Sequence, residues 1–286
     1  VPVRLHTVAG LPLMESRGLK RKLLEVTEKL TYRCANNIYP NSYGLYDFIT
    51  TNLSKNKSKI KVIGNGSSNG IDTAYYSRKS LSETAILKVR SDYKIENKDF
   101  VYCFIGRLVG DKGINELVTA FKRLKRGKLL LVGPFEEELD PLPVSVTNEI
   151  SKNPDIIVTG FQKDVRPFLA ISHVFVFPSY REGLPNVPMQ AACFDLPCIV
   201  SDINGNNEII ENGKNGLLVP PKDIQSLFDA MERLMKDQKL RKELSSNSRN
   251  AIIQKYEQKY VWQSILQEYY LQLQKHNVLR YNKKVC

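Results

Sequence analysis

Short apolar segments alternate with amphipathic segments from about residue 80 onward, and this alternation restricts the fold more than any other feature of the sequence. The apolar segments predict strands at residues 100–105, 128–132, 156–158, 173–177, 197–201 and 216–219. The amphipathic segments predict helices at residues 81–92, 113–125, 164–171, 186–194 and 223–236, with a short one near Glu208. Strands that alternate with helices form parallel sheets that are covered on both faces. The sequence therefore predicts an α/β fold.

Turn-forming residues follow several of these predicted strands. The segments concerned are Gly106-Arg107, Gly133-Pro134, Gly160-Phe161 and residues 178–186. Ligands of open parallel sheets bind outside the carboxyl ends of the strands. We therefore expect these four segments to meet at one edge of the sheet and to form a binding site there.

The turn after the strand 173–177 has the most informative composition. Asn186 can cap a helix, and Pro188 is tolerated only within the first turn of one. The N–H groups and the positive dipole end of that helix would then face a ligand as an anion site. Glu182 lies in the turn and Gln190 about one helical turn into the helix, so both can contact the same ligand. A phosphate site with polar groups on either side is typical of proteins that bind a sugar nucleotide.

The ordered motifs of this region resemble a known enzyme family. The segment Ser179-x-x-Glu182-Gly183-Leu184-Pro185-Asn186, with Gln190 eight residues after the glutamate, resembles the E-x7-E region of retaining glycosyltransferases of family 4, which have the GT-B fold. The resemblance continues through Gly106-Arg107-x4-Lys112-Gly113, Gly160-Phe161, Asn206-Asn207-Glu208 and Asn215-Gly216-Leu217-Leu218-Val219-Pro220. It extends from about Val3 to Leu273, and it is strongest with bacterial enzymes that build capsular and other surface polysaccharides.

The resemblance implies two Rossmann-like domains with parallel sheets. Residues 64–72 are rich in turn formers, as expected for an interdomain crossing. About three strands are predicted before this crossing, the last at residues 59–63, whereas a doubly wound half normally has about six. We therefore expect the first part of the N-terminal domain to be missing. The predicted divisions are an incomplete acceptor-side domain with its linker at 1–78, a nucleotide-sugar (donor) domain at 79–255, and a crossover helix with a tail at 256–286.

Two basic residues flank the loop between the predicted strand 100–105 and the helix that follows it. The guanidinium of Arg107 and the ammonium of Lys112 suit a diphosphate, and they could stabilise a leaving group without a metal ion. The alternative is that both are solvated residues at a helix start, where cations oppose the helix dipole. The resemblance assigns both to the catalytic site and to the donor diphosphate.

The other predicted site residues come from the resemblance. It implies that Glu182 contacts the hydroxyls of the transferred sugar and supports positive charge at the anomeric carbon. Gln190 replaces a ribose-binding glutamate, and its amide oxygen would accept a weaker hydrogen bond. His6 matches a histidine that faces the donor sugar, although a lone histidine is more often structural. The remaining donor-binding candidates are Gly160, Phe161, Gly183, Leu184, Pro185 and Asn186.

The net charge of +12 fits phosphate-bearing ligands, nucleic acid or an anionic membrane surface. No nucleic-acid-binding motif is visible, and a solvated basic surface without a specific partner remains the alternative. Leu19, Leu23, Val26, Leu30 and Cys34 recur at helical spacing, and basic residues occupy the other face at Arg17, Lys20, Arg21, Lys22, Lys29 and Arg33. This amphipathic helix is either an ordinary surface helix or a contact for anionic lipid headgroups.

The composition indicates in which cellular compartment the protein works and whether it binds a metal ion. No apolar run approaches the roughly 20 residues that span a bilayer. Five scattered cysteines without a C-x-x-C pair indicate reduced thiols in a cytoplasmic protein, at most peripheral at the inner membrane face. No cluster has metal-ligand spacing, so neither a metal nor a cofactor is expected.

Together these features predict a retaining hexosyltransferase. It would move a hexose or N-acetylhexosamine from a nucleoside-diphosphate sugar, with a UDP-sugar favoured, to a saccharide acceptor that we expect to be lipid-linked, for example to polyprenyl diphosphate. Two alternatives stay open: a nucleotide-sugar epimerase of the same fold, and an inactive remnant that only binds the donor. The base, the sugar, the acceptor and the linkage are not specified by the sequence.

Overall fold

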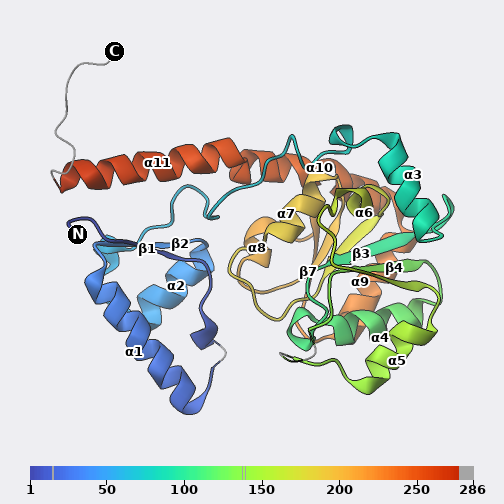
Figure 1. The fold of residues 1–286 in the computed structure, drawn as a ribbon, viewed down its shortest axis with the longest axis horizontal. Coiled ribbons are helices and arrows are strands. Elements are labelled where there is room, and N and C mark those ends of the chain that lie inside the picture. Colours follow the sequence, from blue (N-terminus) through green and yellow to red (C-terminus); the bar gives the residue numbers. More distant parts are fainter. Residues whose placement is uncertain (15, 137, 139, 277–286) are drawn as a thin grey trace. The chain divides into compact units, whose positions relative to one another are not determined.

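The computed structural model describes residues 1–14, 16–136, 138 and 140–276 of the chain (Figure 1). It divides into two compact units. One comprises Val1–Gly70 together with the chain from Lys255 onward, and the other comprises Ile71–Gln254. We call them the first unit and the second unit.

The second unit is built on a six-stranded sheet in which every strand pairing is parallel. Its strands are β3 (Val101–Ile105), β4 (Lys128–Val132), β5 (Ile156–Gly160), β6 (Val174–Phe177), β7 (Cys198–Ser201) and β8 (Gly216–Val219). Their order is β5-β4-β3-β6-β7-β8, so the chain starts in the middle, moves outward to one edge and then returns to build the other half. The predicted α/β fold with a parallel sheet is confirmed, and the order reverses between β3 and β6. Sheets of this kind bind ligands beside such a reversal.

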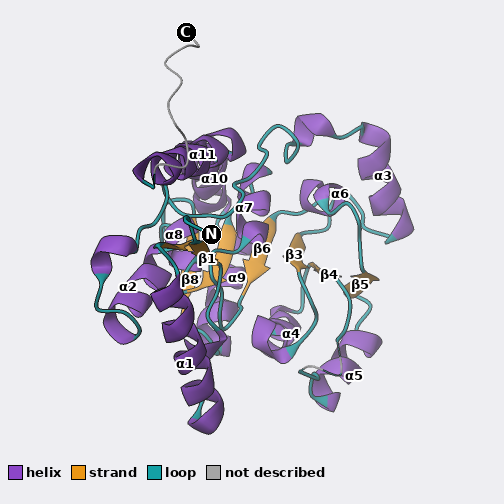
Figure 2. Cartoon of the chain, turned by 60° about the vertical axis from the view of Figure 1, so that its left-hand side comes forward, coloured by secondary structure: helices purple, strands orange, loops and turns teal. Residues whose placement is uncertain are grey.

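Helices cover both faces of this sheet (Figures 1 and 2). They are α3 (Glu83–Asp92), α4 (Ile114–Leu124), α5 (Val144–Lys152), α6 (Arg166–Ala170), α7 (Asn186–Cys193), α8 (Asn206–Ile209), α9 (Ile224–Lys236) and α10 (Gln238–Tyr256). Helices α4, α5 and α9 pack together on one face, and α3, α6 and α7 lie on the other. Because the central strands are covered on both sides, all five residues of β3 are buried.

Among its described residues, the first unit contains two parallel strands and three α-helices. The strands are β1 (Leu5–Val8) and β2 (Asn37–Pro40), and the helices are α1 (Gly18–Cys34), α2 (Tyr43–Asn52) and α11 (Gln258–Lys275). The third strand predicted at residues 59–63 is wrong. Residues Lys57–Lys59 form a 3₁₀ turn capped by the side chain of Asn56, and beyond it Ile60 makes an isolated bridge to Ile38.

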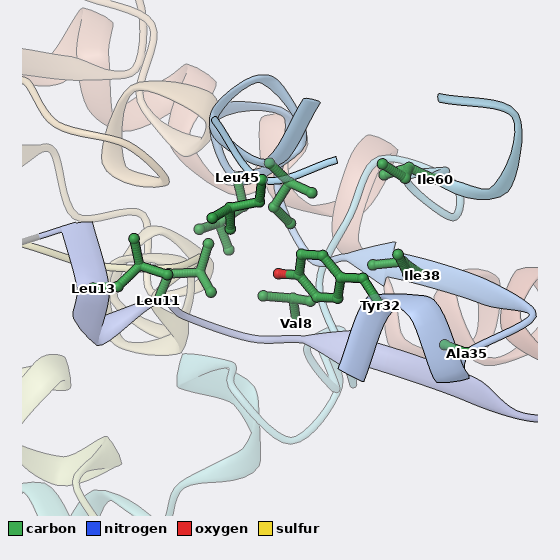
Figure 3. Close-up of a cluster of buried hydrophobic side chains, with 10 residues drawn as sticks. Val8, Leu11, Leu13, Tyr32, Ala35, Ile38, Leu45 and Ile60 are labelled. Carbon is green, nitrogen blue, oxygen red and sulfur yellow. The ribbon is translucent and has the colours of Figure 1, made fainter. Parts of the chain in front are cut away.

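A small apolar core holds the first unit together (Figure 3). It consists of Val8, Leu11, Leu13, Tyr32, Ala35, Ile38, Leu45, Ile49, Leu53 and Ile60. Helix α1 contributes Tyr32, from its last turn, to this core, whereas Leu19, Leu23, Val26 and Leu30 are 60–85% exposed. The periodicity therefore predicted the helix correctly, but its apolar stripe lies open within the described part of the chain.

Helix α11 is anchored to the N-terminal residues of its unit through a buried carboxylate. Glu268 is 5% exposed and accepts hydrogen bonds from the Tyr39 hydroxyl (3.0 Å), from Lys61 Nζ (2.7 Å) and from Gln272 Nε2 (2.8 Å). Burial acts to raise the pKa of Glu268, but the hydrogen bonds from Lys61, Gln272 and Tyr39 outweigh it and hold that pKa below its ordinary value. The charged form is therefore the one that stabilises the fold.

We expect Glu268→Gln to lower the free energy of unfolding of the first unit by about 1–3 kcal/mol at neutral pH, because hydrogen bonds to a charged acceptor are lost. The folded pKa of Glu268 lies below its unfolded pKa, so this contribution is fully present above the unfolded pKa and is lost as the pH falls through the folded pKa. Urea denaturation followed by the fluorescence of Trp262, the single tryptophan and a residue of α11, measures it.

Glu25→Gln is the matched control, since Glu25 pairs with Lys29 along α1, at the surface of the same unit. An equal loss of stability in both variants, or an unchanged acid sensitivity in Glu268→Gln, would contradict the assignment of Glu268.

Candidate active site

The carboxyl ends of β3 and β6 bring together two predicted site residues that lie 70 positions apart in the sequence. Lys112 follows β3 at the end of a 3₁₀ turn, Gly110–Lys112, and Glu182 lies in the turn between β6 and α7. Lys112 Nζ lies 2.7 Å from Glu182 Oε1, and the two side chains are 16% and 14% exposed. Since β3 and β6 are neighbours in the sheet, this ion pair sits where the strand order reverses.

Only one oxygen of the Glu182 carboxylate is occupied within the described part of the chain. Ser179 Oγ donates to Oε1 at 2.8 Å, so this oxygen meets both the serine and the lysine. Asn204, in the loop after β7, donates to the backbone carbonyls of Glu182 and Gly183 at 3.1 Å each. The glutamate is therefore held by three loops, and its second oxygen, Oε2, remains available to a ligand.

Two glycines allow these loops to approach one another. Gly113 has a φ of +71°, and a Cβ there would lie 2.1 Å from the carbonyl oxygen of Pro178. Gly205 has a φ of +80°, and its Cβ would lie 2.2 Å from the carbonyl oxygen of Gly183. Neither position accepts a side chain without moving the backbone, because the φ and the close contact both require glycine. Gly113 of the sequence motif thus has a structural role at the site.

Two further contacts fasten the turn after β3 to the turn after β6. The backbone N–H of Tyr180 donates to the carbonyl oxygen of Asp111 at 2.9 Å, and Arg181 Nη2 lies 3.1 Å from Asp111 Oδ2. The Tyr180 hydroxyl donates to Glu116 at 2.6 Å. Sequence reasoning missed Asp111 and Asn204 as supports of the site, since their role depends on partners from distant loops. Ser179 was part of the motif, but its hydrogen bond to Glu182 was not predicted.

Arg107 has a carboxylate partner of its own. Its Nη1 lies 2.9 Å from Glu136 Oε2, in the loop after β4, and the hydrogen bond that Arg107 donates to Glu136 raises the pKa of the guanidinium. The side chain is 41% exposed. The structure places Arg107 on the same sheet edge as Lys112, and a bound diphosphate would have to compete with Glu136 for the guanidinium.

Helix α7 begins one residue earlier than a cap at Asn186 would require. Pro185 is the N-cap residue and Asn186 is already helical, so the predicted capping role of Asn186 is wrong. Pro185 adopts an extended conformation and has no side-chain acceptor, and Pro188 lies within the first turn. The first turn of α7 therefore lacks a side-chain cap for its N–H groups, which suits an anion.

Gln190 lies one turn along α7 and contacts a residue that was not predicted. Its Nε2 donates at 2.9 Å to the hydroxyl of Tyr76, which lies near the start of the second unit. No spacing in the sequence signals this pair, because the two residues are 114 positions apart. The prediction that Gln190 and Glu182 contact the same ligand stays a prediction.

The remaining predicted residues fall into two groups. Gly160 ends β5 with a φ of +65°, and Phe161 beside it is 77% exposed, so an aromatic face is open at this edge. Gly183, Leu184 and Pro185 form the turn before α7, where the Leu184 side chain is 7% exposed and packs in the core. Leu184 can therefore contact a ligand through its backbone but hardly through its side chain.

His6 belongs to the first unit, on β1. Its ring centroid lies 5.8 Å from that of Tyr32, with the ring planes tilted by 50°. This contact explains the position of His6 within its own unit. Its role toward the donor sugar stays a prediction.

Neither a metal-binding cluster nor a membrane-spanning helix occurs in the described part of the chain. There, no group of three or more His, Cys, Asp or Glu side chains is arranged to hold a metal ion. The helices of that same part include none that combines the length and the apolar character needed to cross a bilayer. Four cysteines, Cys34, Cys103, Cys193 and Cys198, are free thiols, and Cys286 lies outside the described residues.

Comparison with known proteins identifies the family. Residues 86–251 match the family of glycosyl transferases group 1. The chain is 33% identical over 270 residues to the capsular polysaccharide biosynthesis glycosyltransferase CapM of Staphylococcus aureus, with 92% of this chain and 69% of CapM covered. It is 28% identical over 262 residues to the UDP-Gal:alpha-D-GlcNAc-diphosphoundecaprenol alpha-1,3-galactosyltransferase of Escherichia coli, with 88% and 65% covered. The chain therefore belongs to the glycosyl transferases of group 1, and it spans about two thirds of the length of these relatives.

Solved structures establish the fold as GT-B. The crystal structure of Anabaena Alr3699/HepE in complex with UDP superposes with a TM-score of 0.80 at 21% identity, over 93% of this chain and 72% of that one. A sucrose-phosphate synthase from Thermosynechococcus elongatus gives a TM-score of 0.80 at 21% identity, over 95% and 68%. The predicted GT-B class is thereby confirmed.

Lys112→Ala removes the ion-pair partner of a largely buried carboxylate. We expect it to lower the free energy of unfolding of the second unit by about 1–3 kcal/mol, because Glu182 keeps its desolvation cost and loses a charged hydrogen bond. The control is Lys122→Ala, because the Lys122 side chain is 65% exposed and its pair with Glu149 should contribute well under about 1 kcal/mol. Urea denaturation followed by circular dichroism compares them, and equal effects would show that the Lys112–Glu182 pair is only a surface contact.

Proposed function

We propose that the protein transfers a hexose or N-acetylhexosamine from a nucleoside-diphosphate sugar to a saccharide carried on polyprenyl diphosphate, with retention of anomeric configuration, in the synthesis of a surface polysaccharide. The observation that carries this proposal is the Lys112–Glu182 pair, which lies at the sheet reversal beside an uncapped helix start. Support for the setting comes from the relatives, whose names describe capsular polysaccharide biosynthesis and transfer to a diphosphoundecaprenol-linked sugar.

A UDP-sugar is the proposed donor. HepE, which shares the fold, has been crystallised with UDP and with UDP-glucose, and the Escherichia coli relative is named for UDP-Gal. On the present chain the exposed ring of Phe161 and the open backbone at Gly160 offer a place for the base at the same sheet edge. These observations support UDP as the nucleotide of the donor, but they do not specify its sugar.

Two cations and the start of α7 would act on the leaving group of the reaction. When the bond to the anomeric carbon breaks, negative charge develops on the departing diphosphate, and Arg107 and Lys112 are the cations placed to stabilise it. The N-terminal turn of α7 adds N–H groups and the positive dipole end. We propose that these groups act on the leaving group without a metal ion or a cofactor.

Glu182 acts on the sugar. Lys112 and Ser179 hold its Oε1, so the carboxylate keeps its orientation while Oε2 accepts a hydrogen bond from a hydroxyl of the transferred sugar. Its negative charge also supports the positive charge that develops at the anomeric carbon. Retention of configuration and a role for His6 at the donor sugar are proposed from the resemblance to family 4 alone.

The test of the proposed reaction is acceptor-dependent release of UDP. UDP-glucose, UDP-galactose and their N-acetylated forms are incubated with the protein, with and without a polyprenyl-diphosphate-linked saccharide. We expect UDP release that requires the acceptor and is lost in Glu182→Ala. Release of a rearranged sugar without acceptor would instead indicate an epimerase, and absence of release with retained binding would indicate an inactive donor-binding protein.

Arg107→Ala and Lys112→Ala should each weaken the binding of UDP by roughly 2–4 kcal/mol, because a charged and partly desolvated partner of the diphosphate is removed. Isothermal titration calorimetry with UDP measures the effect, and Arg123→Ala serves as a control because its guanidinium contacts Gln225 on the surface. Unchanged UDP binding in the Arg107/Lys112 double variant would sink the phosphate assignment.

We also propose that α1 contacts an anionic membrane surface at the cytoplasmic face, where a lipid-linked acceptor would be found. The exposed residues Leu19 and Leu23 offer apolar area. Near the other end of the helix, a cavity of about 650 Å³ is lined by four cations, Lys29, Arg33, Lys55 and Lys59, and by no carboxylate. Apolar area next to clustered cations suits lipids with anionic headgroups.

This membrane contact is tested by cosedimentation with vesicles of phosphatidylcholine, alone or with about one third phosphatidylglycerol. We expect binding to the anionic vesicles, weakened by Leu19→Ser/Leu23→Ser and by added salt, because both apolar burial and charge contribute. Leu266→Ser is the control, since Leu266 is a 53% exposed leucine on another helix. If the protein binds neither kind of vesicle, the proposed membrane contact of the apolar stripe of α1 is wrong.

A further inference from the structure

The hydrogen bond between Gln190 and Tyr76 has a consequence for how the nucleotide is recognised. Tyr76 lies near the start of the second unit, shortly before the 3₁₀ turn Arg78–Ser80. Its hydroxyl accepts a hydrogen bond from Gln190 Nε2 at 2.9 Å. Burial raises the pKa of this hydroxyl, so it stays protonated and neutral around neutral pH.

Tyr76 is itself held against the helix that carries Gln190. The guanidinium of Arg249, on α10, donates through Nη1 to the carbonyl oxygen of Tyr76 at 3.0 Å and also to that of Cys193. Its Nη2 donates to the carbonyl oxygen of Thr73 at 2.6 Å. Because Cys193 is the last residue of α7, one side chain fixes both the tyrosine segment and the helix of Gln190.

The two ends of a glutamine amide differ chemically. The oxygen accepts hydrogen bonds and the nitrogen donates them, so an amide offers an acceptor to a ligand only when it is turned the right way. A carboxylate needs no such orientation, because either of its oxygens accepts. In the structure the amide nitrogen of Gln190 is taken by Tyr76, and within the described residues no hydrogen bond reaches its Oε1.

We propose that Tyr76 is a positioning residue, which holds the amide of Gln190 so that its oxygen accepts from a ribose hydroxyl of the bound nucleotide. The inference rests on the proposed function, since it takes a nucleotide as the ligand of this site. Tyr76, from a distant part of the chain, would thereby contribute to nucleotide recognition. Its hydrogen bond would keep the amide of Gln190 turned with the oxygen toward the ligand.

The experiment is a set of calorimetric titrations with UDP and, as a probe without ribose, inorganic pyrophosphate. Tyr76→Phe removes the hydroxyl and keeps the ring, and we expect it to weaken UDP binding by about 3- to 10-fold, the value of one neutral hydrogen bond. Gln190→Ala should weaken UDP binding by a similar factor, and the double variant no further. Pyrophosphate binding should not change. Tyr75→Phe is the matched control, because Tyr75 is the neighbouring tyrosine and its ring stacks on Arg166.

A rescue separates positioning from a general structural role. In Gln190→Glu the carboxylate accepts through either oxygen, so Tyr76→Phe in that background should leave UDP binding unchanged within about twofold. A parallel loss of UDP and pyrophosphate binding in Tyr76→Phe, or an equal loss in both backgrounds, would overturn the inference. The inference would also be overturned if Tyr76→Phe bound UDP as tightly as the parent protein while Gln190→Ala bound it more weakly. That outcome would not contradict the proposed function. If the parent binds no UDP, the proposed function fails first.

Discussion

The ion pair between Lys112 and Glu182 is the interaction on which the proposed site depends. It exists because β3 and β6 are neighbours in a parallel sheet, so the loops after them meet at one edge although 70 residues separate the partners. The charges are largely removed from water, and Ser179 supplies the further hydrogen bond that such a pair requires. The glycines at 113 and 205 let the supporting loops come close enough to hold the pair.

This arrangement explains how one sheet edge could serve a charged, flexible donor. Cations from the loop after β3 and N–H groups at the start of α7 favour the diphosphate end, while the free oxygen of Glu182 favours the sugar. Further along α7, Gln190 and Tyr76 form a neutral polar pair, which suits ribose hydroxyls better than phosphate. The order of these groups along α7 and the turn before it matches the order of the parts of a sugar nucleotide, and the family to which the chain belongs is consistent with this use.

Much of the second unit could be predicted from the sequence, because its strands are buried on both faces and therefore form continuous apolar runs. The predictions failed where strand formation depended on residues outside the predicted segment. The run at 59–63 alternates like a strand but is preceded by a turn capped by Asn56, and only Ile60 pairs. Helix α5 was not predicted. The apolar stripe of α1 predicted a helix, but it did not show that the stripe is exposed to solvent. The motifs predicted Lys112 and Glu182 as site residues, but their mutual contact, the support from Asn204 and the partner of Gln190 arise from tertiary contacts that no local spacing encodes.

The central claim is that the carboxyl edge of the six-stranded sheet binds the nucleotide of a sugar donor. Amide hydrogen exchange with and without UDP tests this most directly, because it reports on each loop separately. We expect UDP to slow exchange in the loop 106–113 and in the segment 179–190, with little change in α1 of the other unit. Protection confined to other segments, or none at saturating UDP, would contradict it.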